Sequence, residues 1–203
     1  INALGGEVAF IGPSASYSGA DGFTASLSAL DLVASNGAVV TLKGAMLATS
    51  SRDTRLESGA SLFLADQSVV EVQSGALKVG AGSVLAKDLA SSNPLQATVL
   101  ARNVEIATAN ATEAAGVMSL TELAQLYVGN SLLVVGKLEI SGASSVSMPA
   151  QQGIAGMQML AGSVVQKTFG DSAYSNATMT VPTVMIAGAQ TTPTALPAAQ
   201  LRV

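Results

Sequence analysis

Residues 56–87 limit the fold of this chain more than any other stretch, because their apolar runs are short and turn-forming residues separate them. Val70 and Val72 alternate with the polar residues Glu71 and Gln73, and Leu77 and Val79 alternate with Ala76 and Lys78. An apolar residue at every second position is typical of a half-buried strand, whose side chains point alternately to two faces. We therefore predict short strands in which these four aliphatic side chains face inward.

Comparable runs recur along the chain, and turn signals such as Asn36-Gly37 separate them. We predict an all-β fold, a sandwich or jelly-roll-like domain with one short helix. An irregular β-solenoid is the alternative. The triplet SGA and the quartet AGSV (residues 81–84 and 161–164) recur, but no fixed period runs through the chain, so a regular solenoid is not established.

The helix is expected at residues 119–127. Ser119 and Glu122 have the spacing of a capping box. Apolar side chains three or four positions apart would share one helix face; they are Leu120, Leu123, Ala124 and Tyr127.

Residues 98–108 predict a strand of their own. Leu100, Val104 and Ile106 would share one face, but the same assignment places Arg102 among them. A charged side chain on an apolar face conflicts with simple alternation.

Composition favours burial of surface in an assembly. Aromatic residues make up 3% of the chain and Trp is absent, so the core must be built from Ala, Val, Leu, Ile and Met. Charged residues make up 11%, compared with about 25% in typical soluble domains. A stable secreted domain with a Ser, Thr and Gln surface has the same composition and stays an alternative.

The chain contains no His and no Cys. A Ser-His-Asp triad, a Cys-His pair and a zinc site built on His or Cys are therefore excluded. We expect no enzymatic activity, no cofactor and no transition metal. Asp21 and Asp66 could each provide oxygen ligands to calcium, although an Asp in a turn more often bonds its own backbone.

The charge pattern excludes several partners. The net charge is −4 and there is no basic cluster, so nucleic-acid binding is not expected. No apolar run reaches the roughly 18–20 residues of a membrane-spanning helix. The chain begins with Ile, which favours removal of a secretory signal and hence secretion. Asn110 and Asn176 begin glycosylation sequons, which would mark exposed loops in a glycosylated secreted protein.

The run VVTLKGAMLAT, together with ESGASLFLADQSVVEVQSGALKVGAGSVLA, resembles two kinds of secreted bacterial β sequence. One is the β-solenoid of surface adhesins and haemagglutinin-type exoproteins. The other is the FecR-type periplasmic β domain. The resemblance covers residues 38–87 and 131–165 in texture, without a diagnostic motif. The first implies a surface or fibre role, and the second implies a sensor or scaffold domain that binds a partner protein.

We divide the chain into an N-terminal arm (1–12), a β domain (13–180) and an extended C-terminal segment (181–203). Prolines at 182, 193 and 197 forbid helix in the last of these. A strand supplied by one end to the sheet edge of a neighbour would polymerise the protein.

Our functional hypothesis is therefore a non-enzymatic, secreted subunit of an extracellular filament, pilus-like fibre or surface layer, whose partners are copies of itself. We favour the N-terminal arm as the exchanged strand over the C-terminal segment, where two prolines lack the N–H of a paired strand. The candidate interface residues are Leu4, Val8, Phe10, Leu201 and Val203.

Overall fold

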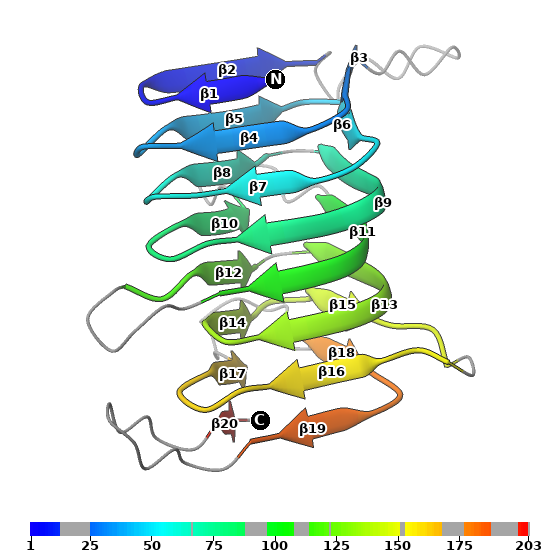
Figure 1. Cartoon of the computed structure of the whole chain (residues 1–203). Coiled ribbons are helices and arrows are strands. Elements are labelled where there is room, and N and C mark those ends of the chain that lie inside the picture. The colour runs from blue at the N-terminus through cyan, green and yellow to red at the C-terminus, as the bar shows by residue number, and fades with distance from the viewer. Residues whose placement is uncertain are drawn as a thin grey trace.

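The structure is a stack of parallel strands. The computed structural model describes residues 1–12, 25–65, 67–87, 97–107, 114–121, 123–150, 153–167, 177–187 and 199–202, and every paired strand among them runs parallel to its partner. The chain winds in successive turns, which we call coils, and each coil lies on the one before it (Figure 1). This architecture is a β-solenoid with one chain end at each end of the stack.

One side of the solenoid is an eight-stranded sheet to which each coil contributes one strand. Its strands, in spatial and sequence order, are β2 (Glu7–Ile11), β5 (Val39–Lys43), β8 (Ser61–Leu64), β10 (Val84–Lys87), β12 (Val117–Leu120), β14 (Lys137–Ile140), β17 (Val164–Lys167) and β20 (Gln200–Arg202).

A twelve-stranded sheet forms the other two sides. Three long strands bend around the corner between them, and in other coils the same path is divided into two shorter strands (Figure 1). The long strands are β9 (Val69–Val79), β11 (Thr98–Ile106) and β13 (Gln125–Val134). The shorter ones are β1 (Asn2–Leu4), β3 (Ala25–Ala29), β4 (Leu32–Ser35), β6 (Met46–Ser50), β7 (Thr54–Leu56), β15 (Ser145–Ser147), β16 (Gly156–Met159), β18 (Thr178–Thr180) and β19 (Val184–Ile186).

The predicted sandwich or jelly roll is wrong, because those folds are built from antiparallel strands and the pairing here is parallel throughout the described residues. Asn36-Gly37 shows why a turn signal in the sequence did not identify the paired strands. Both residues have positive φ, 55° and 70°, as a hairpin turn requires. The turn instead joins β4 to β5, which belong to different sheets. A tight turn therefore marks a corner of the coil and gives no pairing between its two flanking strands.

The same corner recurs in later coils. The amide of Ala60 donates to the Glu57 carbonyl at 3.2 Å, and the amides of Ser83 and Ser163 close equivalent turns at 3.0 Å. All three of these small residues are fully buried. The SGA triplet at 58–60 and both AGSV quartets lie at this corner, where Gly supplies the positive φ and the next residue must be small enough to fit inside. The spacing between equivalent corners varies, which explains why no fixed period appears in the sequence.

Inward side chains form ladders that run the length of the solenoid. The Val8–Leu201 ladder lies in the eight-stranded sheet and consists of Val8, Val40, Leu62, Leu85, Met118, Leu138, Val165 and Leu201. The Ala3–Ile186 ladder lies opposite and consists of Ala3, Ala34, Leu56, Val79, Ile106, Val134, Met159 and Ile186. The buried core is aliphatic, as the composition predicts.

Strand β11 resolves the position of Arg102. The register of β11 against both neighbours shifts between Ala101 and Asn103, so that Val99 and Ala101 point inward before the shift and Val104 and Ile106 point inward after it. Arg102 is exposed at the shift. The prediction that Leu100 shares a face with Val104 is wrong, because one extra residue reverses the alternation.

The predicted helix at 119–127 is also wrong. Leu120 ends β12, Leu123 has a φ of 67° at the following corner, and Tyr127 is an exposed residue of β13. The corner interrupts the alternation of two strands, and the interruption produces three- and four-residue spacings that imitate a helix. Among the described residues there is no helix at all, and hence none that is long and apolar enough to span a membrane.

The inward prediction for β9 is confirmed, since Val70, Val72, Leu77 and Val79 are all buried. We expect Val72→Asp to lower the free energy of unfolding by on the order of 3–5 kcal/mol, because the carboxylate would be buried without a partner. The neighbouring Glu71→Gln, on the outer face, should change it by less than about 0.5 kcal/mol. Urea unfolding of both variants measures the difference, and equal costs would contradict this register.

Close packing of corners makes a second prediction. A Cβ added to Gly136 would lie 2.3 Å from the carbonyl oxygen of Gly116, in backbone that cannot move aside. Gly136→Ala should therefore cost about 1–3 kcal/mol in urea unfolding. Gly129→Ala is the matched control, because its nearest atom, the Cα of Arg102, is 3.5 Å away. The control should stay within about 0.5 kcal/mol.

Candidate functional site at the two ends of the solenoid

The first and last coils each present strands that are paired on one edge only among the described residues. At one end, β1 pairs with β4 and β2 pairs with β5. At the other end, β18, β19 and β20 pair with β15, β16 and β17. An unpaired edge presents backbone N–H and C=O groups to any strand of matching direction. The two ends lie at opposite poles of the solenoid (Figure 1).

The N-terminal end face is apolar. Ile1 is 50% exposed, and Val8 is 36% exposed although it begins a ladder whose central members are buried. Leu4 and Ile11 on the same coil are also exposed. Solenoids that end at a polar capping repeat hide such ladders from water. Among the described residues no polar side chain covers Val8 in this way.

A small cavity lies beneath this face. Its volume is about 100 Å³, and its lining is almost entirely apolar. It reaches from Ile1, Ala3 and Val8 on the first coil inward to Leu62 and Val70. The cavity falls between the ~30 Å³ that one water occupies in liquid and the ~150 Å³ of a dry apolar cavity that holds benzene. The lining favours an aliphatic group over water.

The C-terminal end face is apolar, like the N-terminal one. Ile186 is 51% exposed and Leu201 is 42% exposed, and these residues end the two ladders. Val184 and Met185 of β19 are exposed as well. The Val8–Leu201 ladder therefore has an exposed aliphatic side chain at both of its ends, and the Ala3–Ile186 ladder has one at Ile186, while Ala3 is partly buried.

Of the five interface residues predicted from sequence, the structure places three in the ladders or against the core. Val8 and Leu201 are the two ends of one ladder, and Phe10 packs partly buried against the core. Leu4 is 69% exposed at the end of β1. Val203 lies outside the described residues. Both predicted segments thus contribute to end faces, but β1 and β2 pair within their own chain.

Sequence reasoning missed Ile1, Val184 and Ile186. Their neighbours in sequence give no sign that they differ from buried aliphatic residues elsewhere. Only the position of the coil in the stack distinguishes them.

The outer surfaces of the two ends carry charges of opposite sign, negative at the N-terminal end and positive at the C-terminal end. Glu7 is exposed on β2, and Arg202 is exposed on β20 of the same sheet. The Arg202 guanidinium donates to Oε1 of Gln200 on its own strand. Both charged residues lie on the outer face, since each is adjacent to an inward member of the Val8–Leu201 ladder.

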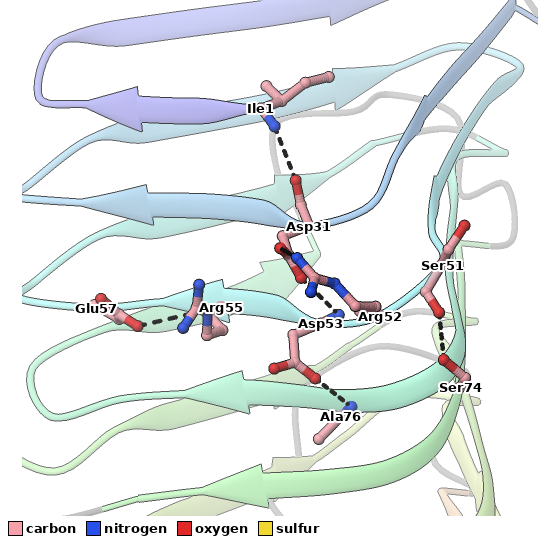
Figure 2. Close-up of polar contacts among 9 residues, drawn as sticks. All are labelled: Ile1, Asp31, Ser51, Arg52, Asp53, Arg55, Glu57, Ser74 and Ala76. Carbon is pink, nitrogen blue, oxygen red and sulfur yellow. Dashed lines mark hydrogen bonds and ion pairs between the residues drawn. The ribbon is translucent and has the colours of Figure 1, made fainter.

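A polar corner holds the first coil in place (Figure 2). The nitrogen of Ile1 donates to the Asp31 carbonyl at 2.8 Å. The Asp31 carboxylate is paired with Arg52, and its Oδ1 accepts from the Asp53 amide at 3.3 Å. Asp53 repeats the arrangement one coil further on, where its Oδ1 accepts from the Ala76 amide at 2.9 Å. These contacts join the coils of β1, β4, β7 and β9 at one corner.

Arg52 changes the acidity of Asp31. The hydrogen bond from Arg52 is the largest influence and lowers the pKa of the Asp31 carboxyl, desolvation opposes it, and the hydrogen bond from the Asp53 amide lowers the pKa further. A shallow cavity of about 380 Å³ lies beside this corner, lined by Asp31, Arg52 and Asp53 among others. Because the carboxylates already have partners, the contacts describe a structural corner.

Several sequence-based expectations fall outside the described residues, namely Asp21 and Asp66 as calcium ligands and the sequons at Asn110 and Asn176. Within the part of the chain that the structure describes, no three carboxylates gather in a group that could hold a metal ion.

Comparison with protein families, with curated proteins and with solved structures finds no match to this chain.

The lowered pKa of Asp31 predicts a pH dependence. The carboxylate stabilises the fold at any pH above its ordinary value of 3.8, and this contribution is lost as the pH falls through the lowered pKa. Thermal unfolding of wild type and Asp31→Asn should therefore differ at pH 7 and converge in strong acid. A melting-temperature difference that stays constant down to the acid limit would contradict this assignment.

Proposed function

We propose that this protein is a non-enzymatic structural subunit that stacks end to end with copies of itself into an extracellular filament, pilus-like fibre or surface layer. The observation that carries the proposal is the pair of end faces. Each has unpaired parallel strand edges and uncovered members of the same inner ladders.

Direction favours a second copy as the occupant of each face. All strands of the eight-stranded sheet run parallel, so β20 of one copy can lie on β2 of the next without reversing strand direction. Such an interface uses two different surfaces, one from each end. An interface of this kind repeats without closing unless the subunits curve into a ring, and it generates filaments.

Burial of the exposed ladder ends supplies the driving force. Covering an aliphatic side chain such as Ile186 or Leu201 contributes about 1.5–3 kcal/mol when burial is complete, and each is already about half covered. Backbone groups of the unpaired edges would gain the same partners that they have between coils. In this form of the proposal the terminal strands stay in their own chain, and assembly proceeds by stacking of edges in place of strand exchange.

Composition supports the remaining parts of the proposal. With no His and no Cys, the chain lacks the side chains that most often act as bases, nucleophiles and metal ligands. Low charge suits a protein whose surface is partly covered in an assembly. The resemblance to secreted bacterial β sequences supports a location outside the cell.

Replacing an end-face side chain with a charge tests the proposal. We expect Leu201→Asp to raise the concentration needed for polymerisation by about tenfold or more, because stacking would bury an unpaired carboxylate. Leu100→Asp is the matched control, since Leu100 is an exposed leucine in the middle of the solenoid. It should polymerise as wild type does. Light scattering and negative-stain microscopy measure both variants, with urea unfolding to check that each is folded.

Two outcomes would overturn the proposal. One is a wild-type chain that stays a monodisperse monomer at high concentration, which would favour the alternative of a domain that binds a different protein. The other is equal loss of polymer in Leu201→Asp and Leu100→Asp, which would mean that association depends on general surface hydrophobicity.

A further inference from the structure

We propose that the joint between copies has a fixed register, in which Gln200 lies opposite Glu7 and Leu201 lies opposite Val8. This inference rests on the proposed end-to-end assembly and adds the alignment of its two faces. It extends the pairing seen between coils by one step, so that the end of each ladder meets its beginning in the next copy.

The apolar faces fit this register. In the eight-stranded sheet, Leu201 would cover Val8 as it covers Val165 within its own chain. In the other sheet, Ile186 would lie over Ala3, a small residue that lines the 100 Å³ cavity. A large side chain meets a small one at the point where space is available. Packing of this kind fills a cavity whose lining now lacks contacts on one side.

The charges on the outer face fit it too. Arg202 would lie opposite Ala9, next to Glu7 on the same face of the same strand. The solenoid already contains such an arrangement in this sheet. The carboxylate of Glu139 is 2.6 Å from Nζ of Lys137 on its own strand and accepts from Nε2 of Gln166 on the next coil at 2.7 Å. Arg202 and Gln200 would supply the cation and the amide, and Glu7 the carboxylate.

Other registers lose these contacts. A slip of one residue turns the inward side chains of β20 outward. A slip of two toward the C-terminal end of β1 and β2 would place Ile186 at the corner where Gly5 and Gly6 both have positive φ, and it would move Arg202 to a position opposite Ile11, away from Glu7. A slip of two in the other direction would place Leu201 opposite Gly6, which has no side chain for it to cover. Because both sheets belong to one rigid coil, the register that suits one sheet must suit the other.

Engineered disulfides test the register, since the chain has no Cys of its own. Residues 7 and 200 lie at opposite ends of one copy (Figure 1), so a bond between them must join two copies. Directly opposite residues of neighbouring strands are about 4.8 Å apart, within the range of a disulfide. We expect the Glu7→Cys, Gln200→Cys chain to form a ladder of linked copies on a non-reducing gel after mild oxidation of the polymer.

The matched control is Ile11→Cys with Gln200→Cys. Ile11 is exposed on the same face of β2, but in the proposed register it lies about 13 Å along the strand from the position opposite Gln200, beyond disulfide reach. Linkage of the control in preference to the first pair would overturn the register. Polymers in which neither pair links would overturn it as well and leave the filament intact. Failure of wild type to polymerise would instead overturn the proposed function.

Charge reversal tests the outer contact separately. Glu7→Arg and Arg202→Glu should each raise the concentration needed for polymerisation by about fivefold, as expected for an exposed pair turned repulsive. The double variant should restore it, because the charges are then exchanged. A double variant that is no better than either single variant would overturn the pairing of Glu7 with Arg202.

Discussion

Parallel, in-register pairing of each coil with the next is the interaction on which the rest of this structure depends. A single coil has two or three short strands and no strand partner of its own, so it cannot satisfy its backbone or bury its inner face alone. Stacking does both at once. The amide of Val84 donates to the Ala60 carbonyl one coil away at 2.9 Å, while Leu85 lies on Leu62 inside. The ladders, the small residues at the corners and the polar contacts around Asp31 all follow from the need to keep successive coils aligned.

The same interaction accounts for the two ends. A stack held together by its neighbours leaves its first and last coils half satisfied, with edges that invite further pairing. In this protein the ends carry no polar cap among the described residues, and the exposed side chains there include Val8, Leu201 and Ile186, which are terminal members of the buried ladders. The contacts that would join two copies are therefore of the same kind as those within one copy. The proposed assembly would use the same backbone pairing and aliphatic packing as the fold. This similarity favours a structural role.

The corners show how composition serves this arrangement. Small residues such as Ala60 and Ser83 are fully buried where the chain turns from one sheet to the other, and Gly116 and Gly136 are used where a carbonyl approaches too closely for a Cβ. Aromatic side chains would not fit such a narrow interior in every coil. The scarcity of aromatic residues and the many Ala, Gly and Ser thus follow from the narrow interior and from the close approach of successive coils at the corners. They give no direct information about a ligand.

Local structure could be predicted from the sequence. The inward orientation of Val70, Val72, Leu77 and Val79, the aliphatic core and the turn at Asn36-Gly37 are all confirmed. Those features depend on neighbours along the chain, through side-chain alternation and the φ preference of single residues. The sequence did not determine which strands pair. An alternating strand has the same pattern in an antiparallel sandwich and in a parallel solenoid, so the partner of β9 could be learned only from the fold. Only the fold shows that the register shift in β11 leaves Arg102 exposed, that β12 ends at Leu120 and β13 begins at Gln125 where a helix was expected, and that Ile1 and Ile186 are exposed. Exposure of those aliphatic residues depends on whether another coil lies above or below them, and this is a property of the stack that no local pattern records.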